Sequence, residues 1–232
     1  MGCCCCCGSS APRVLPEEKS EQSEADLFAE LLKEELGPGN KHGWQIKSDW
    51  PKSYDKKQFM MRVSLRDHHE TGNPNKLLRG DGKYKGVTPE DFLGFLLKPD
   101  LPGLKEWVDV ETLPDGFIKY CRVKAPCLAA RDHCWKYTID RREDGSIFVC
   151  IRTTTHPKCP EKPGVIRAYY YNSSVFKMSD TEEGVMEMTE FIFQDLGGGL
   201  PPSLMNAALP KGTLEANKKE MKVLLEKKKG SE

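Results

Sequence analysis

Few side chains in this sequence are spaced for catalysis. Those that could transfer a proton or attack a substrate are His133, Cys134, His156, Glu187 and Glu190. None of them stands at a recognisable Ser-His-Asp or Cys-His spacing, which a nucleophile and its base would require. Binding is therefore a better expectation than catalysis, and we predict that the protein is not an enzyme.

Cysteines are the other chemically active residues, and five of the ten are consecutive. The remaining five form no CxxC pair and have no histidine at zinc-ligand spacing: Cys121, Cys127, Cys134, Cys150 and Cys159. An odd number of scattered thiols is typical of a reducing compartment. We therefore expect no metal, no cofactor and a cytoplasmic location.

The consecutive cysteines follow an N-terminal glycine, a pattern typical of lipid acylation. Gly2 can take myristate once Met1 is removed, and palmitate can be attached to Cys3, Cys4, Cys5, Cys6 and Cys7. The myristoylation pattern has Ser or Thr where this chain has Cys6. A second acyl chain makes anchoring stable, so neighbouring cysteines suit an anchor. We expect a lipoprotein held peripherally on the cytosolic face of a membrane; the alternative is a metal-binding or oxidation-prone tail.

Charge and hydropathy narrow the function further. The 35 basic and 35 acidic residues cancel, so no long-range field favours nucleic acid or an acidic membrane. No apolar run approaches the roughly 20 residues of a membrane span, and the chain start lacks the pattern of a secretory signal.

The length of 232 residues fits one domain with a tail. No pattern in the sequence indicates an oligomer, so we expect a monomer.

Composition divides the chain into three parts. Residues 1–22, rich in Cys, Pro, Glu and Ser, predict a disordered, acylatable tail and linker. Leu and Phe recur at helical spacing over residues 23–36 and predict an amphipathic helix, which Gly37-Pro38-Gly39 would end. Residues 40–230 are expected to form the main domain.

Within that domain the pattern is of short strands followed by a helix. We predict strands at 58–65, 75–85, 116–123, 132–141, 146–154, 165–172, 175–178 and 185–195, with a tight hairpin at Asp144-Gly145. An apolar helix should follow Gly197-Gly198-Gly199, break at Pro210 and Gly212, and restart at Thr213 with many lysines on its polar side. This predicts an α+β fold, a curved antiparallel sheet with a helix laid on it, suited to enclosing an apolar ligand.

Five motifs occur in order along this domain: Trp107, Val123-Lys124 with Pro126, Arg131-Asp132, Gly164-Val165-Ile166-Arg167-Ala168, and Gln194 to Pro201 with Asn206. In order and spacing they resemble the motifs of the START lipid-transfer domain. The match covers roughly residues 44–229. The resemblance implies the helix-grip fold, in which a curved antiparallel sheet wraps around a long C-terminal helix and one lipid lies in the tunnel between them. It implies a non-enzymatic lipid-binding or lipid-transfer protein.

The resemblance also suggests a lipid class. In the phosphatidylcholine-transfer-like branch, aromatic rings surround the choline, and the matching positions here are Tyr120, His133 and Tyr171. That branch binds the phosphate with an arginine, and the matching position is Leu104, with Lys105 beside it. The arginine of sterol-binding members corresponds to Tyr137. The resemblance thus implies a phospholipid, with Lys105 and the three rings as contacts.

Other motif residues are interpreted as structural. Arg131 and Asp132 are expected to pair ionically at the entry to a strand, and Arg167 is expected to satisfy a buried carboxylate.

Two kinds of alternative stay open. Helix-grip relatives include cyclases, hydrolases and small-molecule binders, so an enzyme or a small-molecule-binding protein could have the same pattern. A membrane-anchored lipid sensor would also share it. The expected partners are a phospholipid and a membrane surface, which would be contacted through the acylated N-terminus and the lysines of the C-terminal helix.

Overall fold

A computed structural model describes residues 24–36, 39–51, 59–68, 73–97, 103–124 and 128–229. The elements in this part of the chain are, in order, α1 (Glu24–Leu32), β1 (Gln45–Trp50), β2 (Phe59–His68), β3 (Asn73–Lys85), α2 (Pro89–Leu96), β4 (Leu104–Leu113), β5 (Gly116–Val123), β6 (Ala130–Arg141), β7 (Ile147–Thr153), β8 (Val165–Arg167), β9 (Tyr169–Met178), β10 (Val185–Asp195) and α3 (Pro202–Lys229).

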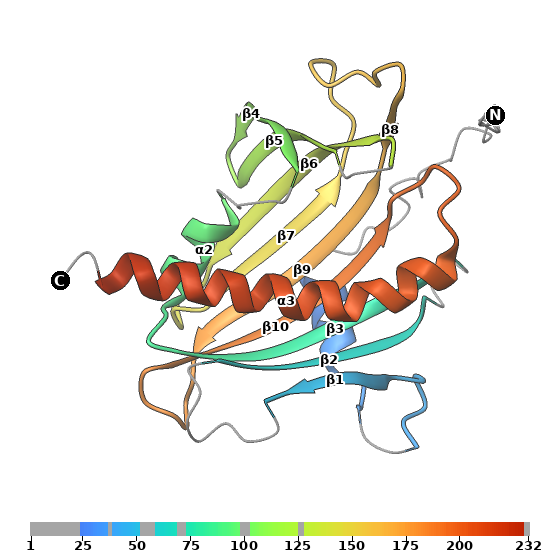
Figure 1. The fold of residues 1–232 in the computed structure, drawn as a ribbon. Helices are drawn as coiled ribbons and strands as arrows, with labels where there is room; N and C mark the ends of the chain where they lie inside the picture. The colour runs from blue at the N-terminus through green and yellow to red at the C-terminus, as the bar shows by residue number, and fades with distance from the viewer. Residues whose placement is uncertain are drawn as a thin grey trace.

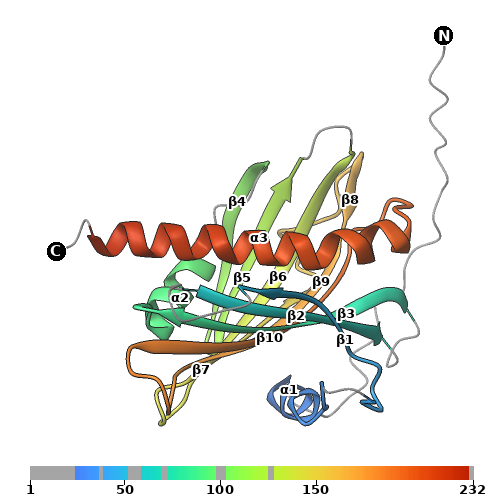
Figure 2. The same ribbon diagram turned by 60° about the horizontal axis from the view of Figure 1, so that its bottom comes forward.

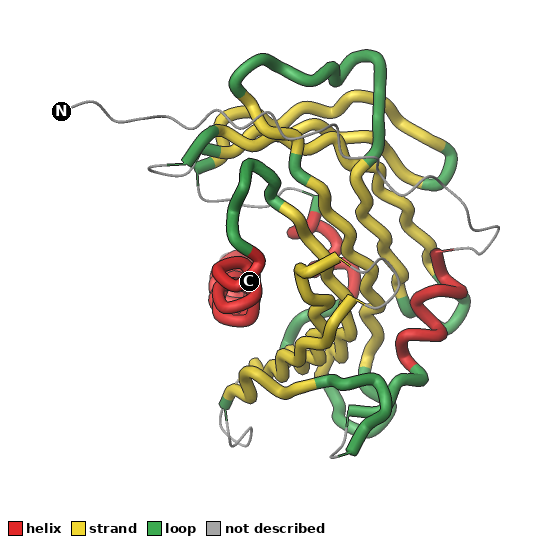
Figure 3. Tube along the Cα trace, turned by 90° about the vertical axis from the view of Figure 1, so that its right-hand side faces the viewer, coloured by secondary structure: helices red, strands yellow, loops and turns green. Residues whose placement is uncertain are grey.

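The strands form one sheet in the order β1-β2-β3-β10-β9-β7-β6-β5-β4, and β8 is added to β6. Neighbouring strands along this path are antiparallel, whereas β8 lies parallel to β6. A view along α3 shows the sheet curving around the helix (Figure 3). The predicted α+β architecture, a curved antiparallel sheet with a C-terminal helix, is confirmed.

The helix α3 lies across the concave side of the sheet (Figure 1). We call the side of the sheet toward α3 the inner face and the other side the outer face. Alternate residues of each strand point inward, because successive side chains of a strand point to opposite faces. One apolar cluster joins the inner face to the helix, and it includes Met61, Val63, Leu78, Val149, Phe176, Met186, Leu214, Met221 and Leu224.

The outer face is covered in part by α1, on the side of the sheet away from α3 (Figure 2). Phe28 of α1 makes edge-to-face contacts with Phe148 and Phe191, each with ring centroids 5.4 Å apart. Leu31 and Trp44 are buried in the same cluster. The helix predicted over residues 23–36 is described over Glu24–Leu32, and its apolar side docks on the sheet.

Helix α2 closes one end of the inner face. Thr88 caps it by accepting a hydrogen bond from the Asp91 backbone N–H, and the Asp91 side chain in turn accepts from the Thr88 backbone N–H. The ring of Phe92 packs between the sheet residues Tyr84 and Phe176, with centroid separations of 5.2 and 4.9 Å.

The sequence prediction lacked β1 and β4, and two further details were wrong. The predicted break at Pro210 and Gly212 does not occur, since α3 is continuous through both residues. A proline removes one backbone donor from a helix, but Leu214 and Met221 beyond it are buried against the sheet, and this packing stabilises the second half of the helix. The strands predicted at 165–172 and 175–178 are instead the short β8 and the long β9.

The described cysteines Cys121, Cys134, Cys150 and Cys159 are all buried and unbridged. In the same part of the chain, no helix has the length and apolar character needed to cross a membrane.

Candidate functional site

The inner face beneath α3 is the candidate site because it combines a large apolar surface with a few buried polar groups. Most of its side chains are aliphatic or aromatic. Polar atoms placed among them can fix the orientation of a bound molecule.

Aromatic rings gather on β6 and the strands around it. His133 and Trp135 lie 4.6 Å apart between ring centroids, and Tyr170 of β9 lies 5.4 Å from Trp135. Trp107 of β4 contacts Trp135 from the other side, at 6.1 Å. His133 Nδ1 and Trp135 Nε1 are buried and have no hydrogen-bond partner among the described residues. Burial lowers the pKa of His133 to about 4, so the imidazole is neutral at physiological pH.

A second polar group lies on β9 and β10. The Asn172 side-chain amide donates to Glu190 Oε2 at 3.2 Å, and the Ser174 hydroxyl donates to Asn172 Oδ1 at 3.0 Å. Glu190 is 7% exposed, and its other oxygen, Oε1, has no partner in the described part of the chain. Burial raises the pKa of Glu190 to about 7 although Asn172 opposes the shift.

Helix α3 adds Asn217 to this cluster of polar side chains. The hydroxyl of Tyr84 on β3 donates to Asn217 Oδ1 at 2.5 Å, and the Asn217 amide donates to the Thr213 carbonyl at 3.0 Å. Burial, together with the nearby charge of Glu190, raises the pKa of Glu220, one turn further along α3, to about 8. The inner face and α3 thus each contribute one carboxyl group whose pKa is raised.

Glycines on β3 leave room for these side chains. Gly80 is paired in register with Glu190, and a Cβ atom placed on it would lie 2.9 Å from Glu190 Oε1 and 2.7 Å from the Met61 methyl carbon. A Cβ on Gly82 would lie 2.7 Å from the Tyr84 ring. Any larger residue at position 80 would therefore displace Glu190.

The structure does not bring together the three rings that the sequence suggested as a choline site. His133 lies on the inner face with Trp135. Tyr120 lies on the outer face in a cluster with Ile118, Cys134 and Cys159, and Tyr171 packs into the outer-face cluster beside α1. Lys105 is exposed on β4. Tyr120 and Tyr171 thus lie on the face opposite to His133, which spacing along the chain does not reveal.

The structural ion pair lies between Asp132 and Arg167. The Asp132 carboxylate accepts hydrogen bonds from Arg167 Nε at 2.7 Å and from an Arg167 terminal nitrogen at 3.1 Å. Arg131 instead donates to the backbone carbonyls of Ala129, at 2.7 Å, and Leu196, at 3.4 Å. Arg167 thus satisfies a buried carboxylate, whereas the bonds of Arg131 go to the backbone.

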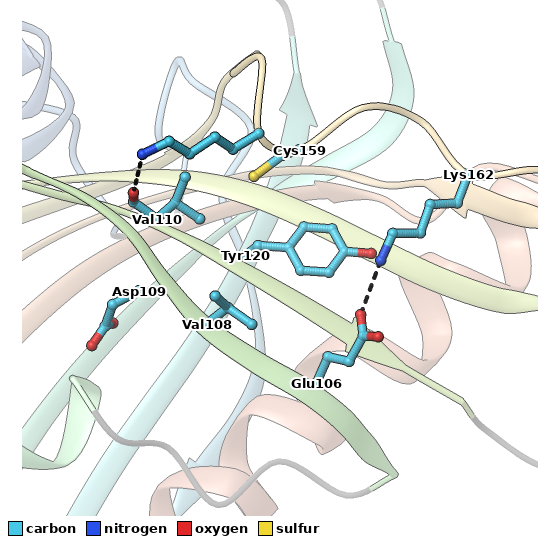
Figure 4. A pocket seen from close by; sticks show the side chains of 8 residues that line it. Glu106, Val108, Asp109, Val110, Tyr120, Cys159 and Lys162 are labelled. Atoms are coloured by element: carbon cyan, nitrogen blue, oxygen red, sulfur yellow. Dashed lines mark hydrogen bonds and ion pairs between the residues drawn. The ribbon is translucent and has the colours of Figure 1, made fainter.

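A surface pocket lies on the outer face, away from α3 (Figure 4). It encloses about 380 Å³ and is lined by Glu106, Val108, Asp109, Val110, Tyr120, Lys158, Cys159 and Lys162. Lys162 lies 4.5 Å from the Tyr120 ring centroid and 3.2 Å from Glu106 Oε2. The polar groups of this pocket are thus largely engaged with one another.

The side chains that could act as a general base or a nucleophile do not lie together. His156 bonds Glu111 at 2.8 Å on the outer side, far along the chain from Glu190 and His133 of the inner face. Burial raises the pKa of Cys134 to about 12, which disfavours a thiolate. In the described ranges, no cluster of three or more metal-ligating side chains occurs.

Comparison with known proteins decides the family. The family model described as START domain matches residues 111–230, which is more than half of the chain. This chain belongs to the START family. Members of the family are lipid-binding and lipid-transfer proteins.

Relatives of this START protein are named StAR-related lipid transfer protein 5. The Mus musculus protein is 29% identical over 156 residues, covering 61% of this chain and 72% of its own length. The Homo sapiens protein is 26% identical over 152 residues, covering 60% and 70%.

Solved START structures share the fold. The human StAR-related lipid transfer protein 5 structure superposes with a TM-score of 0.69 at 19% identity, over 87% of this chain and 93% of that one. Human STARD10 superposes with a TM-score of 0.70 at 17% identity, over 90% and 82%. At these identities the likeness shows the helix-grip fold alone.

Sequence reasoning about this START protein found part of the polar site. It named His133 both as a lipid-contacting ring and as a catalytic candidate, and Glu190 as a catalytic candidate alone. It missed Tyr84, Asn172, Ser174 and Asn217. The available signal was the pair of glycines at 80 and 82 within a strand pattern, because glycine inside a strand often marks a close approach of other groups.

Proposed function

We propose that this protein is a non-enzymatic carrier that binds one lipid between the inner face of the sheet and α3. The observation that carries the proposal is the buried apolar face itself, on which Glu190 Oε1, His133 Nδ1 and Trp135 Nε1 have no hydrogen-bond partner in the described part of the protein. Buried polar atoms without partners are costly, and a ligand with a polar end and an apolar body would satisfy those that its polar end reaches. Family membership supports the same function.

The phospholipid expected from the sequence was argued from a choline cage at Tyr120, His133 and Tyr171. These side chains lie on two faces of the sheet, so they cannot surround one choline group together. The three rings therefore give no support for a phospholipid. The headgroup has to be inferred from the inner face instead.

We also propose that the N-terminus tethers the carrier to a membrane. Gly2 and the acylation candidates Cys3 to Cys7 lie outside the described residues, so this proposal rests on the sequence pattern. Exposed lysines of α3 such as Lys219 and Lys222 would support contact with anionic lipid. A tethered carrier would exchange lipid locally or sense it at one membrane.

Native mass spectrometry of the full chain, purified from a eukaryotic host, tests the carrier. We expect a one-to-one complex whose extracted ligand is a lipid. A protein that is empty and also takes up no lipid from mixed vesicles would contradict the proposal.

The tether is tested separately by replacing Cys3 to Cys7 with serine. We expect the variant to move from the membrane fraction to the soluble fraction while its lipid content stays unchanged. A variant that stays in the membrane fraction would rule out the acyl anchor.

A further inference from the structure

We infer that the polar end of the bound lipid is uncharged and carries hydroxyl or amide groups, and that Glu190, held in place by Asn172, recognises it. This inference rests on the proposed lipid-binding function and names the class of lipid for that site.

The first support is an acceptor with no partner. Glu190 Oε1 is buried on the inner face and has no hydrogen-bond partner within the described ranges, while Oε2 accepts a hydrogen bond from the Asn172 amide. The Ser174 hydroxyl fixes Asn172 in turn by donating a hydrogen bond to it. Because Gly80 has no side chain, there is room beside it for Glu190 Oε1. A carboxyl oriented in this way is prepared to exchange hydrogen bonds with a hydroxyl or amide.

The second support is the sign of the local charge. Burial raises the pKa of Glu190 on the sheet, and burial together with the nearby charge of Glu190 raises the pKa of Glu220 on α3. A lipid phosphate placed here would add a third acidic group to a poorly solvated region, which is strongly unfavourable. With a pKa of about 7, Glu190 is about half protonated at neutral pH, and Glu220, with a pKa of about 8, is mostly protonated, so that both can donate as well as accept.

The third support is that the cations near the inner face are engaged elsewhere. Lys119 pairs with Asp109 and lies against the rings of Trp107 and Phe117. Lys218 pairs with Glu215 at 2.9 Å and lies over the Trp50 ring. Neither is free to neutralise a phosphate beside Glu190.

Arg131 offers the rival position for a phosphate. Through the strand pairings, Glu190 lies level with Ser174, Val149 and Ile139. Arg131 is eight positions from Ile139 along β6, which corresponds to roughly 25 Å at the usual rise of a strand. A phospholipid bound through Arg131 would thus have its phosphate at the other end of the inner face, and the two possibilities can be separated by mutation.

In the experiment, the full chain is incubated with phosphatidylcholine vesicles that also contain phosphatidic acid, diacylglycerol, ceramide, cholesterol and sphingosine. The bound lipid is then identified by native mass spectrometry and extraction. We expect diacylglycerol, ceramide or cholesterol to be enriched over both phospholipids. Glu190→Leu should reduce the bound uncharged lipid about tenfold, since it removes a buried hydrogen-bond partner, whereas Glu190→Gln should retain most of it.

Controls separate recognition from folding. Glu187→Gln alters a carboxylate on the same strand that bonds Ser179 at 2.9 Å on the outer face, and it should leave lipid selection unchanged. If Glu190→Leu fails to fold, Asn172→Leu tests the same polar group.

The outcomes are distinct. Enrichment of phosphatidylcholine or phosphatidic acid that is lost in Arg131→Lys but kept in Glu190→Leu would overturn the inference and leave the carrier intact. Enrichment of sphingosine that is lost in Glu190→Gln would replace the uncharged class by a cationic one and would also overturn it. Uptake of no lipid at all would refute the carrier itself.

Discussion

Asp132 of β6 and Arg167 of β8 form a two-point ion pair between directly paired positions of two parallel strands, with hydrogen bonds of 2.7 and 3.1 Å. Arg167 also donates to the Cys159 carbonyl at 3.0 Å. One guanidinium therefore holds the loop before β8 and the strand itself against β6.

Replacing Asp132 by Asn should be strongly destabilising. The Asp132 side chain is 1% exposed and that of Arg167 is 15% exposed, so the change leaves a largely buried cation without its counterion. We expect the free energy of unfolding to fall by about 3–5 kcal/mol, measured by urea denaturation. Asp180→Asn removes an exposed pair with Lys177 and should cost less than about 1 kcal/mol. Equal losses in both variants would contradict a structural role for the Asp132 pair.

Gly80→Ala should lower both stability and lipid uptake. Its Cβ would lie 2.9 Å from Glu190 Oε1 and 2.7 Å from the Met61 methyl carbon, so the carboxyl must move. Gly94 of α2 has open space around it, so Gly94→Ala should be neutral or stabilise the helix by up to about 1 kcal/mol. Thermal melts and vesicle uptake assays compare the two. Wild-type uptake by Gly80→Ala would show that the position of Glu190 is unimportant for binding.

The lipid-free protein should lose part of its stability as the pH rises from about 5 to 8. Burial raises the pKa of Glu190 from 4.5 to about 7, so in this window the folded state binds more protons than the unfolded state, and stability falls with rising pH. The groups around Glu190 are Asp81, Tyr84, Tyr170 and Glu220. We expect Glu190→Gln to weaken this pH dependence in denaturation measured at several pH values. An unchanged slope would mean that Glu190 is solvated in solution.

Acid should destabilise the fold partly through His133. Burial lowers the pKa of this histidine from 6.5 to about 4, so the unfolded state takes up a proton first as the pH falls through this range. His133→Phe should therefore lose less stability between pH 6.5 and 4 than the wild type does. His42→Gln, at a histidine of the loop before β1, serves as the control. A loss equal to that of the wild type in His133→Phe would argue against a buried neutral imidazole.

Removing the Phe28 ring should detach α1 from the outer face. Phe28 is 2% exposed and touches both Phe148 and Phe191, and we expect Phe28→Ala to cost about 3 kcal/mol. Leu32→Ala, on the same helix but 41% exposed, should cost much less. Limited proteolysis near residue 36 should be faster in the Phe28 variant, and equal rates would mean that docking does not depend on this ring.

The sequence predicted the strands that are bounded by turn glycines and have regular alternation. The strands at 116–123 and 185–195 have the predicted bounds. β9 was divided because Ser173 and Ser174 interrupt the apolar pattern, yet both are buried within the strand. Local pattern does not reveal whether a small polar residue ends a strand or lies in its middle.

The candidate site was harder to predict for a geometric reason. A shift of one residue moves a strand side chain to the opposite face, and this accounts for the positions of Tyr120 and Tyr171. The hydrogen bond between Tyr84 and Asn217 joins residues 133 positions apart. No spacing rule connects such residues, because their contact depends on how α3 lies on the finished sheet.

The place of α3 in the chain order also bears on how the protein is made. Every strand precedes this helix, so a ribosome delivers the whole curved sheet before the element that packs against its inner face. Until residues 202–229 emerge, Leu78, Val149 and Met186 have no helix above them. During this interval the apolar inner face of the nascent chain is exposed. It can then bind a chaperone, aggregate, or take up its first lipid while synthesis is still under way.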